Sequence, residues 1–553
     1  MFTTLFTGPT LLLICLGIIL TRAFCNKYAY GYAKIPGPAL AAYTDLWRFF
    51  NVWGRLPQQT HIALHKRYGP VVRLGPKCIS ISDPDAIRVI YAIKAGFVKS
   101  DFYPVQQPVT RDGTLLQGMF NTTDEKYHAK LRRSVANAFA LSTLVQFEPL
   151  IDSTIEAFLS QLSKRYADKS GQDGTCDFSS WLQFYAFDVI GELTFSRRLG
   201  FVDQGTDVDG IIGDLEWFLG YAAVIGQIPS LDHYLLKNPL RFMLSKLGLT
   251  NATTPVARFA MARMASRQNE QEKAADTRED GQAARRDFLS RFLEAQKKDP
   301  DFLDDRRVLS LTTANMFAGS DTTAISLRAI FYFLLRNPQV LRRLLDELEQ
   351  DDGRLFNSKG FVKWSDVHDL PYLSAVIKES LRCHPAVGLP LERIVPPGGV
   401  VISGYHFAAG TLVGCSAWTI HRNKEIFGQD AAAFRPERWL EGNEEQKTQM
   451  NNFLFSFGAG ALFHKFELSL AHPEEEWELH NACFTTIQYQ SLHAVPVAVE
   501  KDNHYQFCGI KYTSIPGRLK PLIPVNDWNW QTLDRKELEP GPVYVLKSCL
   551  DLD

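Results

Sequence analysis

A short run of small, acidic and hydroxyl residues stands inside a long apolar pattern. The run is Ala318-Gly319-Ser320-Asp321-Thr322-Thr323, and the pattern around it predicts a helix from about Val308 to Leu335. Glycine costs about 1 kcal/mol relative to alanine inside a helix, so its presence calls for a reason. Ala318 and Gly319 would let a flat cofactor approach the backbone, and Asp321 and Thr322 could relay protons to oxygen bound there. Alternatively, the Asp-Thr-Thr run caps a second helix.

A second candidate cluster carries charge. Glu379 and Arg382 are three residues apart, so a helix places them on one face, where they can pair. Most such pairs are solvated surface bridges, and the spacing alone predicts little. Its context is more informative, because Phe434-Arg435-Pro436-Glu437-Arg438-Trp439 follows downstream.

These motifs occur in the order found in the cytochrome P450 superfamily, which the chain resembles from about residue 30 to residue 460. Residues 317–323 match the superfamily's oxygen-helix signature at every fixed position. Glu379 and Arg382 match its Glu-x-x-Arg motif, and Arg438 matches its second arginine motif, which implies that the three form a buried structural triad. The resemblance implies a mainly α fold with small β-sheets.

The resemblance also implies a haem b site. Arg132 and Arg393 match the arginines that contact the haem propionates, and guanidinium groups suit this task because they bind carboxylates bidentately and stay charged. His128 stands where the family usually has tryptophan, and its ring nitrogen could serve as the donor. Ala318 and Gly319 would lie against the haem, with Asp321 and Thr322 as the catalytic residues.

The chain departs from the family where the iron ligand should follow. The run from residue 453 to 460 opens like the family's cysteine loop, in which Phe-x-x-Gly is followed by x-Arg-x-Cys-x-Gly. Counting from Phe457 and Gly460 puts Leu462, His464 and Phe466 at the arginine, cysteine and glycine positions. The sequence therefore offers no cysteine at the expected position, and the helix that should follow is missing too.

Two explanations of this departure differ in their chemistry. His464 could bind iron, since imidazole is a good haem ligand, but a lone histidine is more often an ordinary surface or core residue. Cys383 reads as a packing residue, and Cys508 lacks the glycine and arginine that precede the family's ligand. We interpret the gap as a splicing or gene-prediction error that removed the loop, so that the C-terminal part of the fold is disrupted.

Composition predicts a large globular domain. The 553 residues are 45% hydrophobic, enough for a sizeable core, and the net charge of −1 gives no reason to expect nucleic-acid binding. The nine cysteines are scattered, which suits a reducing compartment. Helices are predicted at Leu144–Leu162 and Leu335–Leu348, strands at Val71–Leu74 and Val400–Ile402, and an exposed loop or helix end at Gln268–Arg286.

The N-terminal segment predicts a membrane anchor. No charge precedes Arg22, and the stretch before it is close to the ~20 apolar residues that span a bilayer. The positive charges that follow place the catalytic domain in the cytosol, with a cleaved signal peptide as the alternative. With the resemblance, this indicates a single-pass protein of the endoplasmic reticulum membrane.

The expected organisation has four parts. Residues 1–26 form the anchor and residues 27–40 form a proline-rich hinge, in which prolines oppose helix and glycine permits a turn. Residues 41–487 form the P450-like domain, without the haem loop and its following helix near residue 460. Residues 488–553 form an unrecognised, irregular tail.

The resemblance implies a monooxygenase that inserts one oxygen atom of O2 into an apolar organic substrate. Electrons would come from a separate NADPH-dependent P450 reductase, and the closing segment around Trp477 is similar to that of fungal secondary-metabolism members. The alternative is a catalytically inactive, membrane-anchored remnant or ligand-binding protein. The missing cysteine favours the alternative, and the complete oxygen helix opposes it.

One apolar run could form a lid that controls how substrate reaches the active site. Trp217–Ile225 stands where the family's lid covers the active site and touches the membrane, although a buried helix explains the pattern equally well. On the lid interpretation, replacing Phe218 and Ile225 by serine lowers membrane affinity.

Overall fold

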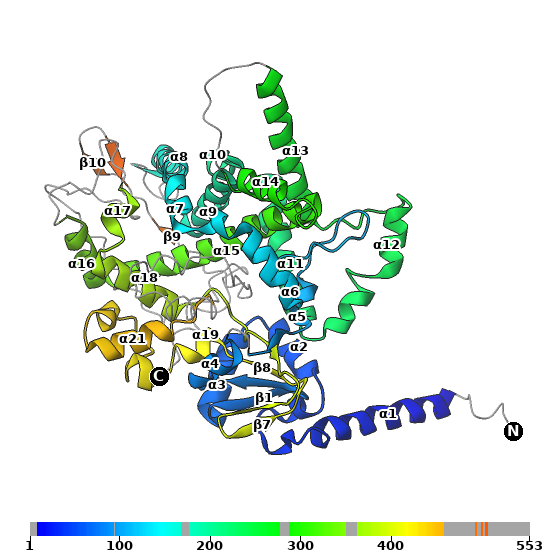
Figure 1. Ribbon diagram of the computed structural model, residues 1–553. Coiled ribbons are helices and arrows are strands. Elements are labelled where there is room, and N and C mark those ends of the chain that lie inside the picture. Colours follow the sequence, from blue (N-terminus) through cyan, green and yellow to red (C-terminus); the bar gives the residue numbers. More distant parts are fainter. Residues whose placement is uncertain are drawn as a thin grey trace, which may run out of the picture.

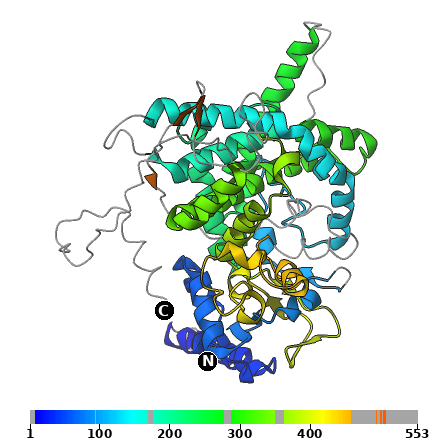
Figure 2. The same ribbon diagram turned by 90° about the vertical axis from the view of Figure 1, so that its left-hand side faces the viewer.

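The structure, a computed structural model, describes residues 8–92, 95–167, 176–276, 287–349 and 362–457, with three short strands between residues 493 and 506. It is mainly α with small β-sheets, as the sequence predicts. Figure 1 shows the helices gathered around α15 (Asp305–Arg336), with the main sheet below them and α1 (Gly8–Tyr28) extending away from the body. In Figure 2 the same sheet region lies beneath the helices, so the two parts form successive layers.

The first helices are α2 (Leu46–Trp53), α3 (Pro57–Tyr68), α4 (Asp85–Ile90), α5 (Phe102–Val105), α6 (Glu125–Val135), α7 (Leu141–Leu144) and α8 (Glu148–Tyr166). Those before α15 are α9 (Phe178–Phe195), α10 (Phe201–Gln204), α11 (Ile211–Ile225), α12 (Pro239–Lys246), α13 (Pro255–Asp276) and α14 (Phe288–Lys298). Those after it are α16 (Pro338–Glu349), α17 (Trp364–Val367), α18 (Pro371–Cys383), α19 (Ala417–Ile420), α20 (Lys424–Phe427) and α21 (Glu444–Asn452). Short 3-10 turns are η2 (Tyr32–Lys34), η3 (Ala39–Ala42), η4 (Ala136–Phe139), η5 (Val145–Phe147), η7 (Val208–Gly210), η8 (Pro229–Tyr234) and η9 (Pro436–Trp439).

The main sheet joins segments that are far apart in the chain. Its five strands follow the order β1-β2-β8-β5-β3. Their bounds are β1 (Val71–Gly75), β2 (Cys78–Ile81), β3 (Val98–Lys99), β5 (Arg393–Ile394) and β8 (Leu412–Gly414). β1 and β2 form an antiparallel pair, whereas β2 runs parallel to β8, which brings residues 78–81 beside residues 412–414. The sheet therefore fixes Arg393, on β5, next to Lys99 on β3.

Three two-stranded sheets complete the β structure of the described residues. Their strands are β4 (Cys176–Asp177) with β9 (His493–Ala494), β6 (Val400–Ile402) with β7 (Tyr405–Phe407), and β10 (Val499–Lys501) with β11 (His504–Gln506). The predicted strands at Val71–Leu74 and Val400–Ile402 are confirmed.

The predicted helices are confirmed with shifted ends. The Leu144–Leu162 pattern becomes α8 after short turns, and the Leu335–Leu348 pattern becomes α16, which starts at Pro338 because proline favours the first turn of a helix. The polar Gln268–Arg286 segment begins as the end of α13, which continues to Asp276; residues 277–286 lie outside the described part of the chain.

Local sequence features explain where the long central helix α15 begins and ends. The side chain of Asp304 accepts a hydrogen bond from the backbone N–H of Arg307 at 2.9 Å, which caps its N-terminus. The helix ends at Arg336, because Pro338 disfavours helical geometry in the residue before it. α9 packs along it, and the side-chain amide of Asn315 donates to the Thr194 hydroxyl at 3.0 Å across the two helices. This packing gives the site on α15 a rigid base.

The N-terminal helix is long and apolar, and its end is fastened to the domain. Thr10–Tyr28 is the helix among the described residues that is long and apolar enough to cross a membrane. At its last turn the Asn26 side chain donates to the Tyr43 carbonyl at 2.7 Å, and Arg73 donates to the Asn26 carbonyl at 2.7 Å. The boundary expected at residue 26 therefore lies inside this helix, two residues before its end.

The structure overturns one expectation about α11. Phe218 and Ile225 are buried, at 4% and 8% exposure, whereas the neighbouring Trp217 is 54% exposed. Phe218 packs in the core that includes Phe259 and Phe317, and Ile225 packs against Val105. Serine at Phe218 and Ile225 would disturb the core rather than withdraw area from a membrane, so the buried-helix interpretation holds for these two side chains.

Candidate active site

The acid and hydroxyl residues lie midway along α15. Thr322 is buried and its Oγ1 donates to the Ala318 carbonyl oxygen at 2.7 Å, one turn earlier on the helix. Ala318, Gly319 and Asp321 are only partly buried, in contrast to Phe317, Ser320 and Thr322 between and beside them. A stretch of helix with small side chains thus carries a carboxylate and a hydroxyl side by side. Such a pair can hold and pass a proton.

A glutamine from α9 holds the carboxylate in place. Gln183 is buried, and its Nε2 donates to Asp321 Oδ1 at 3.2 Å. Its Oε1 accepts a hydrogen bond from Arg328 Nη2 at 2.7 Å, and Arg328 Nε donates to the Ser179 carbonyl oxygen at 3.0 Å. The amide therefore bridges the acid to a guanidinium two helical turns along α15. The arrangement fixes Asp321 without placing a cation directly on it.

The electrostatics of this cluster favour a protonated acid. Burial raises the pKa of Asp321, and the Arg328 charge only partly opposes this. Burial likewise lowers the pKa of Arg328, although the carboxylates around it act to raise that pKa. On α11, burial and then the Asp321 carboxylate raise the pKa of Glu216 to about 7. The site thus holds acids whose pKa values are shifted toward neutral pH, as expected of groups that transfer protons.

We expect Glu216→Gln to change how stability depends on pH. The groups that face Glu216 are Asp321 and Arg328 on α15, Asp207 before α11 and Arg55 after α2. Because folding raises its pKa from the ordinary 4.5 to about 7, the folded protein binds more protons than the unfolded chain between these values. The contribution of Glu216 to stability is then complete below this window and lost as pH rises through it.

The measurement is the melting temperature of both proteins from pH 4 to pH 8. The Gln variant should match the parent at the acidic end and become progressively more stable than it toward pH 7. A difference between the two proteins that stays constant over this range would contradict the assignment.

The charged triad meets at Glu379. Both Glu379 and Arg382 lie on α18, and Arg382 donates to the two carboxylate oxygens at 2.8 Å each. Arg438 Nε donates to Oε1 at 2.9 Å and Trp439 Nε1 donates to Oε2 at 2.9 Å. The Arg435 backbone N–H adds a fifth hydrogen bond at 2.8 Å. Burial alone would raise the pKa of Glu379, but the two guanidinium groups hold it below its ordinary value.

The segment that leads to residue 458 is fastened to the same region. The Phe455 backbone N–H donates to His421 Nε2 at 2.7 Å, and Ser456 Oγ donates to the Leu381 carbonyl oxygen at 3.0 Å. His421 Nδ1 in turn donates to the Arg382 carbonyl oxygen at 2.9 Å. The start of the expected cysteine loop is therefore packed against the triad, up to the last described residue of this segment.

The residues expected at the haem propionates come from separate elements. Arg393 is on β5, and its Nη1 donates to the Tyr103 hydroxyl at 2.9 Å and to the Glu392 carbonyl oxygen at 2.9 Å. Its guanidinium also lies over the Tyr91 ring. Arg132 and His128 are one turn apart on α6, both partly buried. The chemistry of this set suits two carboxylates.

Several residues that could bind the iron lie outside the described part of the chain. His464, Cys483 and Cys508 lie outside the described residues. Two cysteines of the described residues, Cys383 and Cys415, can be judged from their surroundings. Cys383 sits against Arg382 and Glu379, and burial raises the pKa of its thiol to about 12. Cys415 is fully buried in the sheet region, and burial raises its thiol pKa as well. Both thiols are held protonated in packed structure, and neither suits an iron thiolate.

Sequence reasoning missed several members of the cluster. Arg328 stands seven residues after Asp321, and helical spacing could have placed the two on one face. Gln183 lies far upstream on another helix, and no local signal connects it to Asp321. Glu216 directly precedes the Trp217–Ile225 run, which was considered only for its apolar residues.

Comparison with known proteins identifies the fold. The chain matches the family described as Cytochrome P450 over residues 41–461. The chain belongs to the cytochrome P450 family. A cytochrome P450 monooxygenase of Aspergillus terreus is 42% identical over 428 residues, which are 77% of this chain and 85% of the relative.

Two further relatives of this P450 cover still more of its length. The cytochrome P450 monooxygenase cicH of Emericella nidulans is 39% identical over 473 residues, 82% of this chain and 91% of the relative. The cytochrome P450 monooxygenase AFLA_114810 of Aspergillus flavus is 37% identical over 487 residues, 84% of this chain and 93% of the relative. The family match itself ends at residue 461, directly after the last glycine of the Phe-x-x-Gly run.

Proposed function

We propose that this P450 is built as a haem-dependent monooxygenase that inserts one oxygen atom of O2 into an apolar organic substrate in fungal secondary metabolism. The observation that supports it best is the cluster on α15, where Thr322 and Asp321 stand side by side and Gln183 bridges Asp321 to Arg328. A proton-relaying pair on a rigid helix, within a chain of this family, suits reductive oxygen chemistry.

The described residues fit a haem only in part. Arg132 and Arg393, with His128, would bind its two carboxylates, and Ala318 and Gly319 would lie against its face. When bound, haem would supply the activation of O2. The ligand side does not fit, because no cysteine stands at the position that the family motif requires. We therefore assign the protein residues their roles and derive no reaction step through the haem.

The chain's own residues would control protons. Thr322 is held by the Ala318 carbonyl, so its oxygen can accept a proton from a neighbour while it donates along the helix. Asp321, with its raised pKa, would be the group that exchanges protons with the Arg328 and Glu216 side of the cluster.

Thr322→Ala tests this role in a version of the protein that carries a complete cysteine loop. We expect haem binding to remain and a large part of the NADPH consumed to appear as hydrogen peroxide instead of product, because the hydroxyl delivers protons rather than holding the cofactor. The measurement is the ratio of product to NADPH oxidised. Thr323→Ala is the matched control on the same helix, and full coupling in Thr322→Ala would refute the role.

We further propose that the protein is a single-pass membrane protein of the endoplasmic reticulum with its domain in the cytosol. The apolar helix α1 supports this. A second apolar surface supports it too: the most exposed of its side chains are Tyr234, Leu235, Leu240, Met243, Leu247 and Leu249. In Figure 1, α12 lies on the side toward which α1 extends, so both could meet one bilayer. An NADPH-dependent reductase would then reach the domain from the cytosol.

A triple variant tests this surface. Leu240 and Met243 on α12 and Leu247, the residue that caps its C-terminus, stand at helical spacing, and all three are more than half exposed. Replacing them by serine in a version lacking residues 1–24 should weaken partitioning into liposomes at least tenfold, since each side chain withdraws apolar area worth about 1 kcal/mol. Unchanged partitioning would remove α12 from the membrane contact. Serine at the exposed Val401, on β6, is the control.

A second candidate function rests on one specific observation, the absence of a cysteine at the position after Gly460 that the family motif requires, where His464 stands instead. It favours a catalytically inactive, membrane-anchored remnant or ligand-binding protein from a mis-spliced or wrongly predicted gene. We also propose that the chain is organised as a P450-like domain from residue 41 to about 487, followed by a tail. The sequence of the transcript across the Gly460 codon decides between the two functions.

A further inference from the structure

Arg73 is a buried arginine of β1 that joins the end of the N-terminal helix to the main sheet. Its side chain is 2% exposed, and its three nitrogens make five hydrogen bonds, all to backbone carbonyl oxygens. Nη2 donates to Asn26 and Pro76 at 2.7 and 2.8 Å, Nη1 to Tyr32 and Lys27 at 3.2 and 3.3 Å, and Nε to Gly75 at 3.3 Å. Three of these oxygens belong to the end of α1 and the turn after it, and two to the turn between β1 and β2.

The bonds to Asn26 and Lys27 satisfy groups that the helix itself leaves unpaired. The last four carbonyls of an α-helix have no partner within it and carry its partial negative charge. In α1 the first and the last of these four accept from backbone N–H groups of the following turn. The two between them, on Asn26 and Lys27, accept from Arg73. The cation therefore caps the C-terminus of α1.

The segment after α1 lies against the same strand. The Arg73 backbone N–H donates to the Pro36 carbonyl oxygen at 2.8 Å. A Cβ at Gly37 would lie 2.2 Å from the Arg73 carbonyl oxygen, so the two backbones approach too closely for any residue but glycine. The buried Tyr32 hydroxyl accepts from the Ala408 N–H at 2.9 Å. This part of the expected hinge is therefore packed on the domain.

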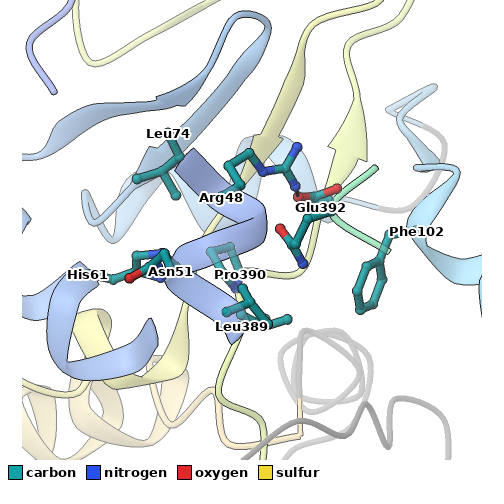
Figure 3. Close-up of a pocket in the computed structure, with 10 residues that line it drawn as sticks. Arg48, Asn51, His61, Leu74, Phe102, Leu389, Pro390 and Glu392 are labelled. Atoms are coloured by element: carbon teal, nitrogen blue, oxygen red, sulfur yellow. Dashed lines mark hydrogen bonds and ion pairs between the residues drawn. The ribbon is translucent and has the colours of Figure 1, made fainter. Parts of the chain in front are cut away.

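The turn that receives the other two bonds is itself supported by α2. A Cβ at Gly75 would lie 2.9 Å from the Arg48 side chain, so this helix packs directly on the turn. Arg48 is buried and pairs with Glu392, the residue before β5, and Figure 3 shows the two side chains facing each other. Ser100 Oγ donates to the other Glu392 oxygen at 2.8 Å. Arg73 thus joins α1 to a part of the sheet that is held from both sides.

The contact lies close to the end of the apolar stretch. Arg22 is the first charged residue, and Asn26 follows it by about one helical turn. Figure 1 shows α1 leaving the domain beside β1 and β7. A bilayer that holds α1 would therefore end next to the sheet, without a spacer between them.

We propose that Arg73 is a clamp that fixes α1 at one angle to the domain, so that the lipid bilayer holds the domain at one tilt. A flexible tether would allow many tilts, whereas a capped and packed helix end passes its orientation to the sheet. The α12 surface would then be presented to the bilayer by α1. The tilt rests on the proposed membrane location, whereas the clamp depends only on contacts within the chain.

Hydrogen exchange tests the clamp without a membrane, on the full chain in detergent micelles. In Arg73→Met the backbone amides of residues 29–35 should exchange about tenfold faster, because the helix end loses hydrogen bonds to a charged group. Amides of α18 should keep their rates, which shows that the domain stays folded. Arg133→Met removes an exposed arginine on α6 and is the matched control, with rates expected to equal those of the parent.

The angle between α1 and the domain can be measured in phosphatidylcholine nanodiscs. Nitroxide-bearing amino acids at Leu12 on α1 and Val401 on β6, both more than half exposed, give the distribution of distances by pulsed electron paramagnetic resonance. The parent and Arg133→Met should each give one narrow distribution, and Arg73→Met a broad one. A distribution in the parent as broad as that of Arg73→Met would mean that α1 is a flexible tether, and would overturn the clamp.

Gly37→Ala is the second variant, used if Arg73→Met does not fold. It changes only the segment before the domain, and its methyl group forces that segment away from β1. It should therefore raise the exchange rates and broaden the distances as Arg73→Met does. Parent-like exchange and a narrow distribution in both variants would also overturn the clamp.

The two proposals can fail separately. Flotation of the full chain with phosphatidylcholine vesicles tests the membrane location. If Arg73→Met speeds exchange but the parent does not float with the vesicles, the membrane location fails and the clamp stands. If the parent floats but Arg73→Met leaves exchange unchanged, the clamp fails and the membrane location stands.

Discussion

Glu379→Gln is expected to lower the free energy of unfolding by about 3–5 kcal/mol, the largest stability effect that we predict for a single side chain. The carboxylate is fully buried and accepts from Arg382, Arg438 and Trp439. Glutamine keeps the volume but removes the charge, and it places an amide N–H where an oxygen accepted hydrogen bonds. Two buried guanidinium groups are then left without their counter-ion, and the cost of breaking such a pair is of this size.

The measurement is urea unfolding followed by circular dichroism at neutral pH. Glu441→Gln is the matched control: it removes a carboxylate that pairs with Arg435 at the surface, with side-chain exposures of 62% and 39%. An exposed pair contributes about 0–1 kcal/mol, so this variant should remain close to the parent. Similar losses in both variants would show that burial of the triad does not set its contribution.

The Glu379 carboxylate should also make the stability of the protein depend on pH. Because the folded state holds the pKa of Glu379 below its ordinary 4.5, its contribution is complete above that value and lost as pH falls through the lower folded value. This pH dependence is opposite in sign to that of Glu216, whose contribution to stability is lost as pH rises toward 7. Acid should therefore weaken the parent chain more than Glu379→Gln.

The parts of the fold that could be predicted are those set by local pattern. The α15 helix follows from apolar spacing and from a capping aspartate before it. Glu379 and Arg382 meet because residues three apart share a helix face. These features depend on neighbours in the chain, and a sequence shows neighbours directly.

The parts that could not be predicted depend on contacts between distant segments. Gln183 reaches Asp321 only because α9 packs along α15. On α11, apolar residues occur on every side, so periodicity could not tell that Phe218 and Ile225 face the core while Trp217 faces outward. Residues 389–392 lie beside α2 and α3 because the main sheet joins segments that are far apart in the chain, a crossover that no motif records.

The domain described up to residue 457 has the architecture of a P450, whereas the sequence after Gly460 has no cysteine at the position that the family motif requires. The triad is formed, the start of the loop is packed against it, and Gln183 holds Asp321 in place on α15. These contacts do not involve the residues after Gly460, where the iron ligand would stand. The retained architecture is therefore not by itself evidence that the chain binds haem.

The chain as given, expressed and reduced under carbon monoxide, is expected not to show the red-shifted Soret band of a thiolate-ligated haem. The family motif places its ligand after Gly460, where His464 stands at the counted position instead of cysteine. The ligand and the groups around it set both how tightly iron is held and how it reacts. Arg132 and Arg393 would bind only the carboxylates at the edge of the ring, so haem should be held weakly or not at all.

A version in which Gly460 is followed by a complete cysteine loop and its helix should show the band, and replacing that cysteine by alanine should abolish it again. This matched pair separates a missing ligand from a domain that fails to fold. A clear thiolate spectrum from the 553-residue chain would refute the account. Serine substitutions at Cys383, Cys415, Cys483 and Cys508 would then identify the ligand; Cys383 and Cys415 would have to leave packed positions that keep their thiols protonated, so Cys483 and Cys508 would be tested first.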